Sequence, residues 1–115
     1  MKVTIYHNPR CSKSRQTLAL LEENGIEPDI VEYLNSPPDQ SRLSEILSRL
    51  KLTARDIMRK NEAIYREKDL DNPALTEEQL IEAMVQNPIL IERPIVLANG
   101  KAAIGRPPEN VLKIL

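Results

Sequence analysis

Two apolar runs separated by Asn99-Gly100 give the clearest prediction of local structure in this chain. The runs are residues 94–97 and 102–104, and an Asn-Gly pair between such runs is the strongest short-range signal of a β-hairpin. Pro107-Pro108 then opens a last predicted helix, because proline is tolerated in the first turn of a helix. The chain is therefore expected to end in a strand, strand, helix unit.

The first third of the chain predicts the other half of a sheet. Residues 2–6 alternate polar and apolar side chains, as a strand with one buried face does. A helix is predicted from about residue 12 to 24, followed by Gly25 as a typical C-terminal stop. Residues 30–34 predict a second strand. This order of elements at the two ends is that of an α/β, thioredoxin-like fold (β-α-β … β-β-α).

The middle of the chain, roughly residues 39–87, is predicted to be a helical insertion between the second and third strands. Four apolar residues there have the spacing of an amphipathic helix: Leu43, Ile46, Leu47 and Leu50. Thr76 begins a capping box that Gln79 closes, which predicts a further helix. Between them, Thr53 is expected to cap a short helix that carries Ile57 and Met58, and Arg59 is also expected to lie inside a helix.

Length and composition limit the class of protein. A chain of 115 residues has the size of one domain, so residues 1–115 are expected to form a single domain. No apolar run approaches the roughly 20 residues that span a membrane, and the N-terminus lacks a signal-peptide apolar region. We therefore expect a cytoplasmic protein that does not bind a membrane. One cysteine excludes an internal disulfide and a cysteine-rich zinc site, and no metal is expected.

Positive charge is concentrated at the two ends of the chain. Four cations precede the first acidic residue, Glu22: Lys2, Arg10, Lys13 and Arg15. Four more lie near the C-terminus: Arg93, Lys101, Arg106 and Lys113. If the two ends meet, they form a small electropositive patch. Such a patch suits a small anion and not a nucleic acid, which usually requires a larger basic surface and often stacking aromatic side chains.

Cys11, the only cysteine, lies where the first strand passes through a loop into the first helix. Unpaired N–H groups at a helix N-terminus stabilise a thiolate, and with basic neighbours they lower a thiol pKa from about 8.5 to roughly 3.5–7.5. The same N–H groups can hold an oxyanion. Cys11 is therefore predicted to be a nucleophile, and the alternative is a buried apolar cysteine.

Two common cysteine motifs are excluded by the residues that follow Cys11. A tyrosine-phosphatase loop has an arginine where this chain has Thr17, and a dithiol redox site has a second cysteine where this chain has Ser14. The protein cannot resolve its own mixed disulfide. A redox cycle at Cys11 therefore needs an external thiol.

The segment 7–18, His-Asn-Pro-Arg-Cys-Ser-Lys-Ser-Arg-Gln-Thr-Leu, closely resembles the active-site segment of the glutaredoxin-coupled arsenate reductases. The resemblance continues through Met58-Arg59, through Glu-Arg-Pro-Ile-Val at 92–96 and through Gly-Arg-Pro-Pro-Glu at 105–109. It implies an enzyme that converts arsenate to arsenite through a covalent Cys11 adduct. Glutathione is the implied co-substrate, glutaredoxin is the implied reductant, and no bound cofactor is implied.

The same resemblance implies that Arg59, Arg93 and Arg106 bind the substrate. Planar, permanently charged guanidinium groups suit oxyanions because they offer paired N–H donors. The alternative for each arginine is a solvated surface charge. Thioredoxin-like folds also place a cis-proline before the third strand, and the resemblance implies that this residue is Pro94.

Four residues around Cys11 are expected to support it in ways that the residues alone leave open. His7 either tunes Cys11 or holds the loop by a hydrogen bond. Asn8 and Ser14 either hydrogen-bond the thiolate or cap the helix, and capping also fits Ser12. Arg15 belongs either to the anion site or to the surface.

Two other functions stay open. The Cys11-x-x-Ser14 pattern permits a glutathione-linked thiol-disulfide oxidoreductase of the same fold. A non-enzymatic regulator that binds RNA polymerase also shares this fold, and many such regulators carry a Cys-x-x-Cys switch. Ser14 and the three arginines argue against that class.

Overall fold

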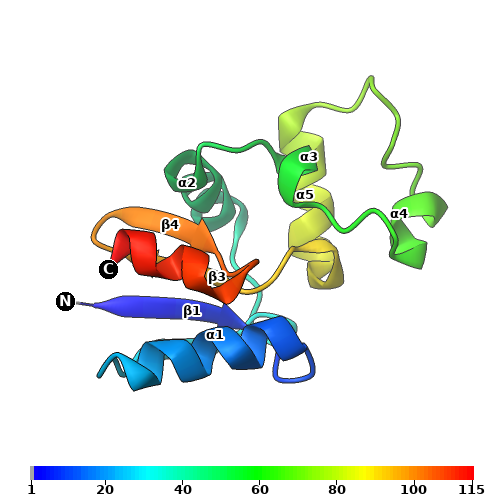
Figure 1. The fold of residues 1–115 in the computed structure, drawn as a ribbon. Helices are drawn as coiled ribbons and strands as arrows, with labels where there is room; N and C mark the ends of the chain where they lie inside the picture. The colour runs from blue at the N-terminus through cyan, green and yellow to red at the C-terminus, as the bar shows by residue number, and fades with distance from the viewer. Residues whose placement is uncertain (1) are drawn as a thin grey trace. The chain divides into compact units, whose positions relative to one another are not determined.

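The computed structural model describes residues 2–115, which form a four-stranded sheet and a series of helices (Figure 1). In chain order the elements are β1 (Val3–His7), α1 (Ser12–Glu23), β2 (Asp29–Glu32), α2 (Gln40–Leu50), α3 (Ala54–Ile57), α4 (Ala63–Glu67), α5 (Glu77–Gln86), the 3₁₀ helix η1 (Pro88–Leu90), β3 (Ile95–Ala98), β4 (Lys101–Ile104) and the 3₁₀ helix η2 (Pro108–Ile114). The chain divides into two compact units, residues 1–36 with 93–115, and residues 37–92. That 1–115 form a single domain stays a prediction.

The sheet belongs to the first unit and has the strand order β2-β1-β3-β4. β1 pairs in parallel with β2 and antiparallel with β3, so that Ile5 lies between Ile30 and Val96. β3 and β4 form the predicted hairpin, in which Asn99 and Gly100 both have the positive φ angles, 55° and 73°, that a tight hairpin turn requires. The predicted thioredoxin-like topology is confirmed.

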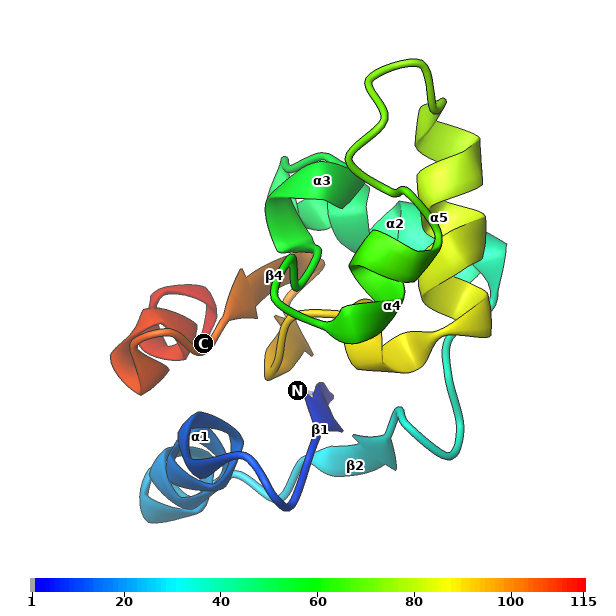
Figure 2. The ribbon, with the colours of Figure 1, turned by 90° about the vertical axis from the view of Figure 1, so that its right-hand side faces the viewer.

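The core of this unit is aliphatic and lies between the sheet and two helices. Figure 2 shows α1 and η2 on the same side of the sheet, where they contact each other. Seven buried residues form this core: Val3, Ile5, Leu21, Val96, Ala98, Val111 and Ile114. Burial of their apolar surface, worth about 25 cal/mol per Å², holds α1 and η2 against the sheet.

The second unit is helical, as predicted for the insertion. The capping box at the start of α5 is confirmed, because the side chain of Thr76 accepts from the N–H of Gln79 and the side chain of Gln79 accepts from Thr76. The sequence reasoning missed α4. It was also wrong about Arg59, because α3 ends at Ile57 and the next residue turns to an extended conformation that bridges to Ile91.

Several predicted boundaries need correction. β1 extends to His7, one residue beyond the strand predicted over residues 2–6. β2 begins and ends earlier than 30–34, because the N–H groups of Asn35 and Ser36 turn back onto the carbonyl of Glu32. The last helix is a 3₁₀ helix that starts at Pro108. Within residues 2–115, no helix is long and apolar enough to cross a membrane.

Candidate active site

Cys11 is the N-cap residue of α1, where the backbone is still extended at φ −93° and ψ 123°. Its N–H donates to the carbonyl of Asn8 at 3.0 Å, and its own carbonyl accepts from the N–H of Arg15 at 3.0 Å. The residue is 7% exposed, although Arg10 and Ser12 on either side of it are exposed. The backbone thus holds the thiol in a recess at the start of the helix.

The surroundings of Cys11 favour its thiolate. Burial raises the pKa of the Cys11 thiol, but the backbone N–H of Ser14, the guanidinium of Arg93 and the backbone N–H of Lys13 together lower that pKa below its ordinary value. The cation comes from Arg93, which lies far away in sequence. No side chain adjacent to Cys11 in sequence is among these causes.

Arg106 is the second arginine at the sulfur. Its Nη2 donates to Sγ of Cys11 at 3.4 Å, and its Nε donates to the carbonyl of Arg93 at 2.8 Å. One arginine precedes β3 and the other follows β4, so the hairpin brings both to Cys11. The Arg93–Pro94 peptide bond is cis, as expected, and the Arg106–Pro107 bond is also cis, which the sequence reasoning missed.

Gly105 lies where the two arginine loops meet α1. Its N–H donates to the carbonyl of Pro94 at 3.0 Å, and its carbonyl lies 3.5 Å from Oγ1 of Thr17, a fully buried residue. A Cβ added at Gly105 would lie 2.4 Å from that Oγ1 and 2.8 Å from Cγ of Pro94. Only glycine fits this contact. The sequence reasoning used Thr17 to exclude a phosphatase loop and missed this packing role.

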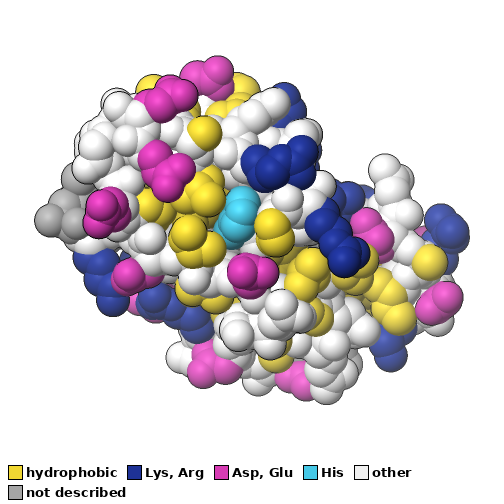
Figure 3. Space-filling model, turned by 90° about the horizontal axis from the view of Figure 1, so that it is seen from below, with side chains coloured by type: hydrophobic (Ala, Val, Ile, Leu, Met, Phe, Trp, Pro, Cys, Tyr) yellow, Lys and Arg dark blue, Asp and Glu magenta, His cyan; other side chains and the backbone are white. Residues whose placement is uncertain are grey.

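His7 and Ser14 form a buried pair beneath the loop. Nδ1 of His7 lies 2.6 Å from Oγ of Ser14, which also accepts the N–H of Asn8 at 3.0 Å. Burial lowers the pKa of His7 and outweighs the opposing effect of Glu32, so the imidazole is neutral at neutral pH. Figure 3 shows the edge of this sole histidine reaching the surface among hydrophobic side chains.

This network decides between the alternatives for the supporting residues. Neither Ser12 nor Ser14 caps α1 through its side chain, so the capping alternative was wrong. The backbone N–H of Ser14 lowers the pKa of Cys11. The hydroxyl of Ser14 instead makes hydrogen bonds with Nδ1 of His7 and the N–H of Asn8. Oδ1 of Asn8 accepts from the N–H of Arg10. Arg15 is exposed and donates to the carbonyl of Pro9 at 2.9 Å, which places it on the surface.

Arg59 belongs to the other unit, residues 37–92. Its guanidinium pairs with Glu62 at 3.2 Å and with Glu92 at 3.1 Å, and its backbone N–H donates to the carbonyl of Leu90. These contacts hold the arginine firmly within its own unit. Its part in substrate binding stays a prediction.

The first unit therefore presents a polarised thiol with two guanidinium groups and the N–H groups of a helix start around it. This arrangement can hold a small oxyanion and attack its central atom. Residues 2–115 contain no group of three or more His, Cys, Asp or Glu side chains placed to hold a metal ion.

The lowered pKa of Cys11 can be tested through the pH dependence of its alkylation rate. Because Arg93 favours the charged form, Arg93→Ala is expected to raise the pKa of Cys11. Iodoacetamide reacts with the thiolate, so the alkylation rate rises with pH and levels off once Cys11 is ionised. The rate should level off at a lower pH in the wild type than for an ordinary thiol. In Arg93→Ala it should level off at a higher pH than in the wild type. Arg10→Ala is the matched control and should behave as wild type. Equal midpoints for the wild type and Arg93→Ala would refute the role given to Arg93.

Comparison with known proteins supports the same description. The sequence profile of the ArsC family matches residues 6–114. The uncharacterized protein YfgD of Escherichia coli K12 is 58% identical over 99% of this chain and 97% of its own length. The arsenate reductase of Neisseria meningitidis serogroup A is 53% identical, with 99% and 98% covered. The solved structure of arsenate reductase from Vibrio cholerae is 50% identical, covers 100% of this chain and 98% of its own, and superposes with a TM-score of 0.97. This chain therefore belongs to the ArsC family and has a thioredoxin-like fold.

Proposed function

We propose that this protein reduces arsenate to arsenite with Cys11 as the nucleophile. The observation that carries the proposal is the sulfur of Cys11, which accepts an N–H from Arg106 at 3.4 Å and has its pKa lowered by Ser14 and Arg93. Relatives over 40% identical across most of this chain bear the name arsenate reductase, which supports arsenate as the substrate.

The proposed first step uses the Cys11 thiolate and the arginine side chains. The Cys11 thiolate attacks arsenic(V) and forms a sulfur–arsenic bond, while one arsenate oxygen is protonated and leaves as water. Arg93 and Arg106 offset the charge on the remaining oxygens, as preorganised donors do in phosphoryl and acyl transfer. Arg59 is proposed as a third ligand of the anion. No metal is needed for this step.

The reduction needs two electrons from outside the chain, because Ser14 stands in place of a second cysteine. We propose that glutathione replaces a second oxygen of the adduct, which also leaves as water. A glutaredoxin thiolate then attacks the glutathione sulfur, forms a disulfide with it and leaves the electron pair on arsenic, now arsenic(III). Water cleaves the Cys11–arsenic bond and releases arsenite. Because the cycle consumes reduced thiols, we place it in the cytoplasm.

A second candidate is glutathione-linked thiol-disulfide exchange. Its support is the thiolate of Cys11 with serine at position 14, a pattern that permits exchange through one thiol. This reaction has no anionic tetrahedral substrate, so it does not require guanidinium groups around the sulfur.

The test is a steady-state assay of purified protein with arsenate, glutathione and glutaredoxin, in which arsenite is separated and quantified. Arsenite should form only when both thiols are present. Arg93→Ala and Arg106→Ala should each lower kcat/KM for arsenate by about 10²-fold, the usual effect of losing one charge-stabilising donor. Arg49→Ala, on the surface of α2, is the matched control. No arsenite, with disulfide exchange retained in both arginine variants, would favour the second candidate.

A further inference from the structure

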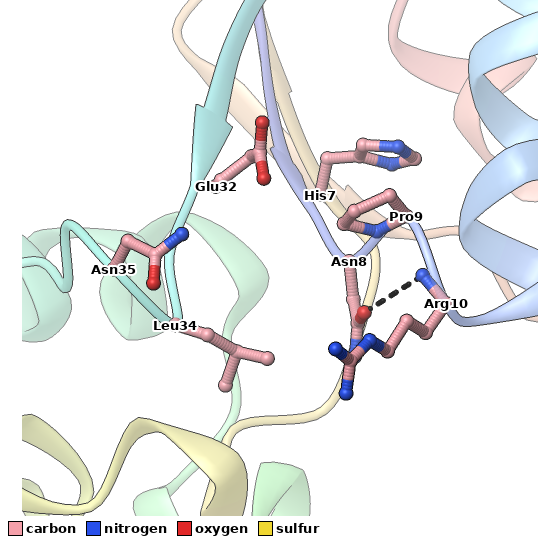
Figure 4. Close-up of a pocket in the computed structure, with 7 residues that line it drawn as sticks. All are labelled: His7, Asn8, Pro9, Arg10, Glu32, Leu34 and Asn35. Carbon is pink, nitrogen blue, oxygen red and sulfur yellow. Dashed lines mark hydrogen bonds between the residues drawn. The ribbon is translucent and has the colours of Figure 1, made fainter.

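A pocket of about 330 Å³ lies beside the loop that leads into Cys11 (Figure 4). Its volume is at the lower end of the range of small-molecule sites, about 300–1,000 Å³. The end of β1 and the following loop supply one wall, with His7, Asn8 and Arg10, and the end of β2 and the turn after it supply the other, with Glu32, Leu34 and Asn35. None of these residues has been given a part in binding arsenate.

The pocket presents one cation and one anion that are not paired with each other. Figure 4 shows the Arg10 guanidinium and the Glu32 carboxylate on separate sides of the space, with the Asn35 amide directed into it. Among residues 2–115, the side chains of Arg10 and Asn35 make no hydrogen bond or ion pair with the protein. A ligand with both an ammonium and a carboxylate group would satisfy both charges.

The loop that lines the pocket leads directly into the reacting residue. Arg10 directly precedes Cys11, so their Cα atoms are about 3.8 Å apart. The hydrogen bond from the N–H of Cys11 to the carbonyl of Asn8 folds this loop tightly beside the pocket. In a γ-glutamyl tripeptide thiol, the zwitterionic end lies about two residue lengths, roughly 7 Å, from the sulfur. A ligand bound to Arg10 by that end has a thiol arm longer than the separation of the Arg10 and Cys11 Cα atoms.

We propose that this pocket binds the γ-glutamyl end of glutathione, with Arg10 on its α-carboxylate and Glu32 on its α-ammonium group. The Asn35 amide adds a hydrogen bond, and Leu34, which is 38% exposed, covers the methylene chain. This inference rests on the proposed function, because it assigns the place from which glutathione attacks the adduct. It gives the pocket a role in thiol selection that is separate from arsenate binding.

A thiol that lacks the γ-glutamyl group tests whether the pocket binds that group. Arsenite formation is measured with glutathione and with cysteinylglycine, which carries the thiol and lacks the γ-glutamyl group. Arg10→Ala and Glu32→Gln should each lower kcat/KM for glutathione by about tenfold or more, as the loss of a charge-assisted hydrogen bond does. Neither variant should change kcat/KM for cysteinylglycine. Arg49→Ala and Glu23→Gln are the matched controls, because neither residue lines this pocket.

Equal losses with both thiols, or no loss with either, would overturn the proposal. An unreactive probe distinguishes failure of the pocket assignment from failure of the proposed function. S-methylglutathione added to the isotope-labelled wild-type protein should shift the backbone amide resonances of Leu34 and Asn35, and Arg10→Ala should abolish those shifts. Shifts confined to other regions would refute the pocket assignment even if arsenate is reduced. Shifts at these two residues without arsenate reduction would refute only the proposed function.

Discussion

Replacing Cys11 by serine is expected to lower arsenite formation by about 10⁴-fold or more, as loss of a covalent nucleophile does elsewhere. A serine hydroxyl does not ionise near neutral pH, so the Ser14 N–H and the Arg93 guanidinium have no anion to stabilise. The hydrogen bonds of Cys11 to Asn8 and Arg15 run through its backbone and persist in the variant. The measurement is arsenite released per enzyme, followed by liquid chromatography with arsenic detection.

Two controls test whether the loss of arsenite formation is due to the missing sulfur alone. Thermal unfolding of Cys11→Ser should match the wild type, because serine fills nearly the same volume. Ser12→Ala, at the exposed neighbouring position, should keep full turnover. If Cys11→Ser retained more than a tenth of the wild-type rate, arsenic would have to be attacked by another group or directly by glutathione.

Gly105→Ala is expected to destabilise the protein by about 1–3 kcal/mol, the usual cost of forcing a methyl group into a packed interior. The new Cβ would meet Oγ1 of Thr17 at 2.4 Å and Cγ of Pro94 at 2.8 Å. Thr17 is fully buried and belongs to α1, so it cannot simply rotate into solvent. Separating these groups also moves Arg106 away from Cys11, so the variant should lose turnover. Urea unfolding gives the stability change.

Two further variants separate this steric effect from a general effect of removing glycine. Gly25→Ala places a side chain at φ 76° with no atom within 4 Å, so it should cost about 1–2 kcal/mol through backbone strain alone. It should leave the alkylation midpoint of Cys11 unchanged. The double variant Thr17→Ala/Gly105→Ala removes one of the colliding groups, so its loss should be smaller than the sum of the single losses. A Gly105→Ala protein as stable as the wild type would contradict the packing described here.

Local patterns in the sequence predict most of the sheet. The Asn99-Gly100 turn fixes the hairpin because both residues tolerate the positive φ angles that it requires, and Gly25 ends α1 for the same reason. Where partners are distant, local patterns fail. Arg59 was expected inside a helix because nothing nearby in sequence reveals that Met58 bridges to Ile91.

The site shows the same contrast between features that depend on local sequence and features that depend on distant partners. The position of Cys11 at a helix start follows from the order of strand, loop and helix around it. The contact of Arg106 with the sulfur and with the carbonyl of Arg93 depends on the hairpin bringing two loops together, which spacing along the chain does not encode. Ser14 shows the limit most clearly, because its side chain was expected either at the thiolate or as a helix cap, and its hydroxyl instead lies against His7.

A crystal structure of the protein soaked with arsenate would show the covalent step at Cys11 itself. We predict arsenic bonded to Sγ of Cys11, with its oxygens within hydrogen-bond distance of the guanidinium groups of Arg93 and Arg106. Arsenate held elsewhere, with the Cys11 sulfur unmodified and still in contact with Arg106, would show that Cys11 is not the nucleophile.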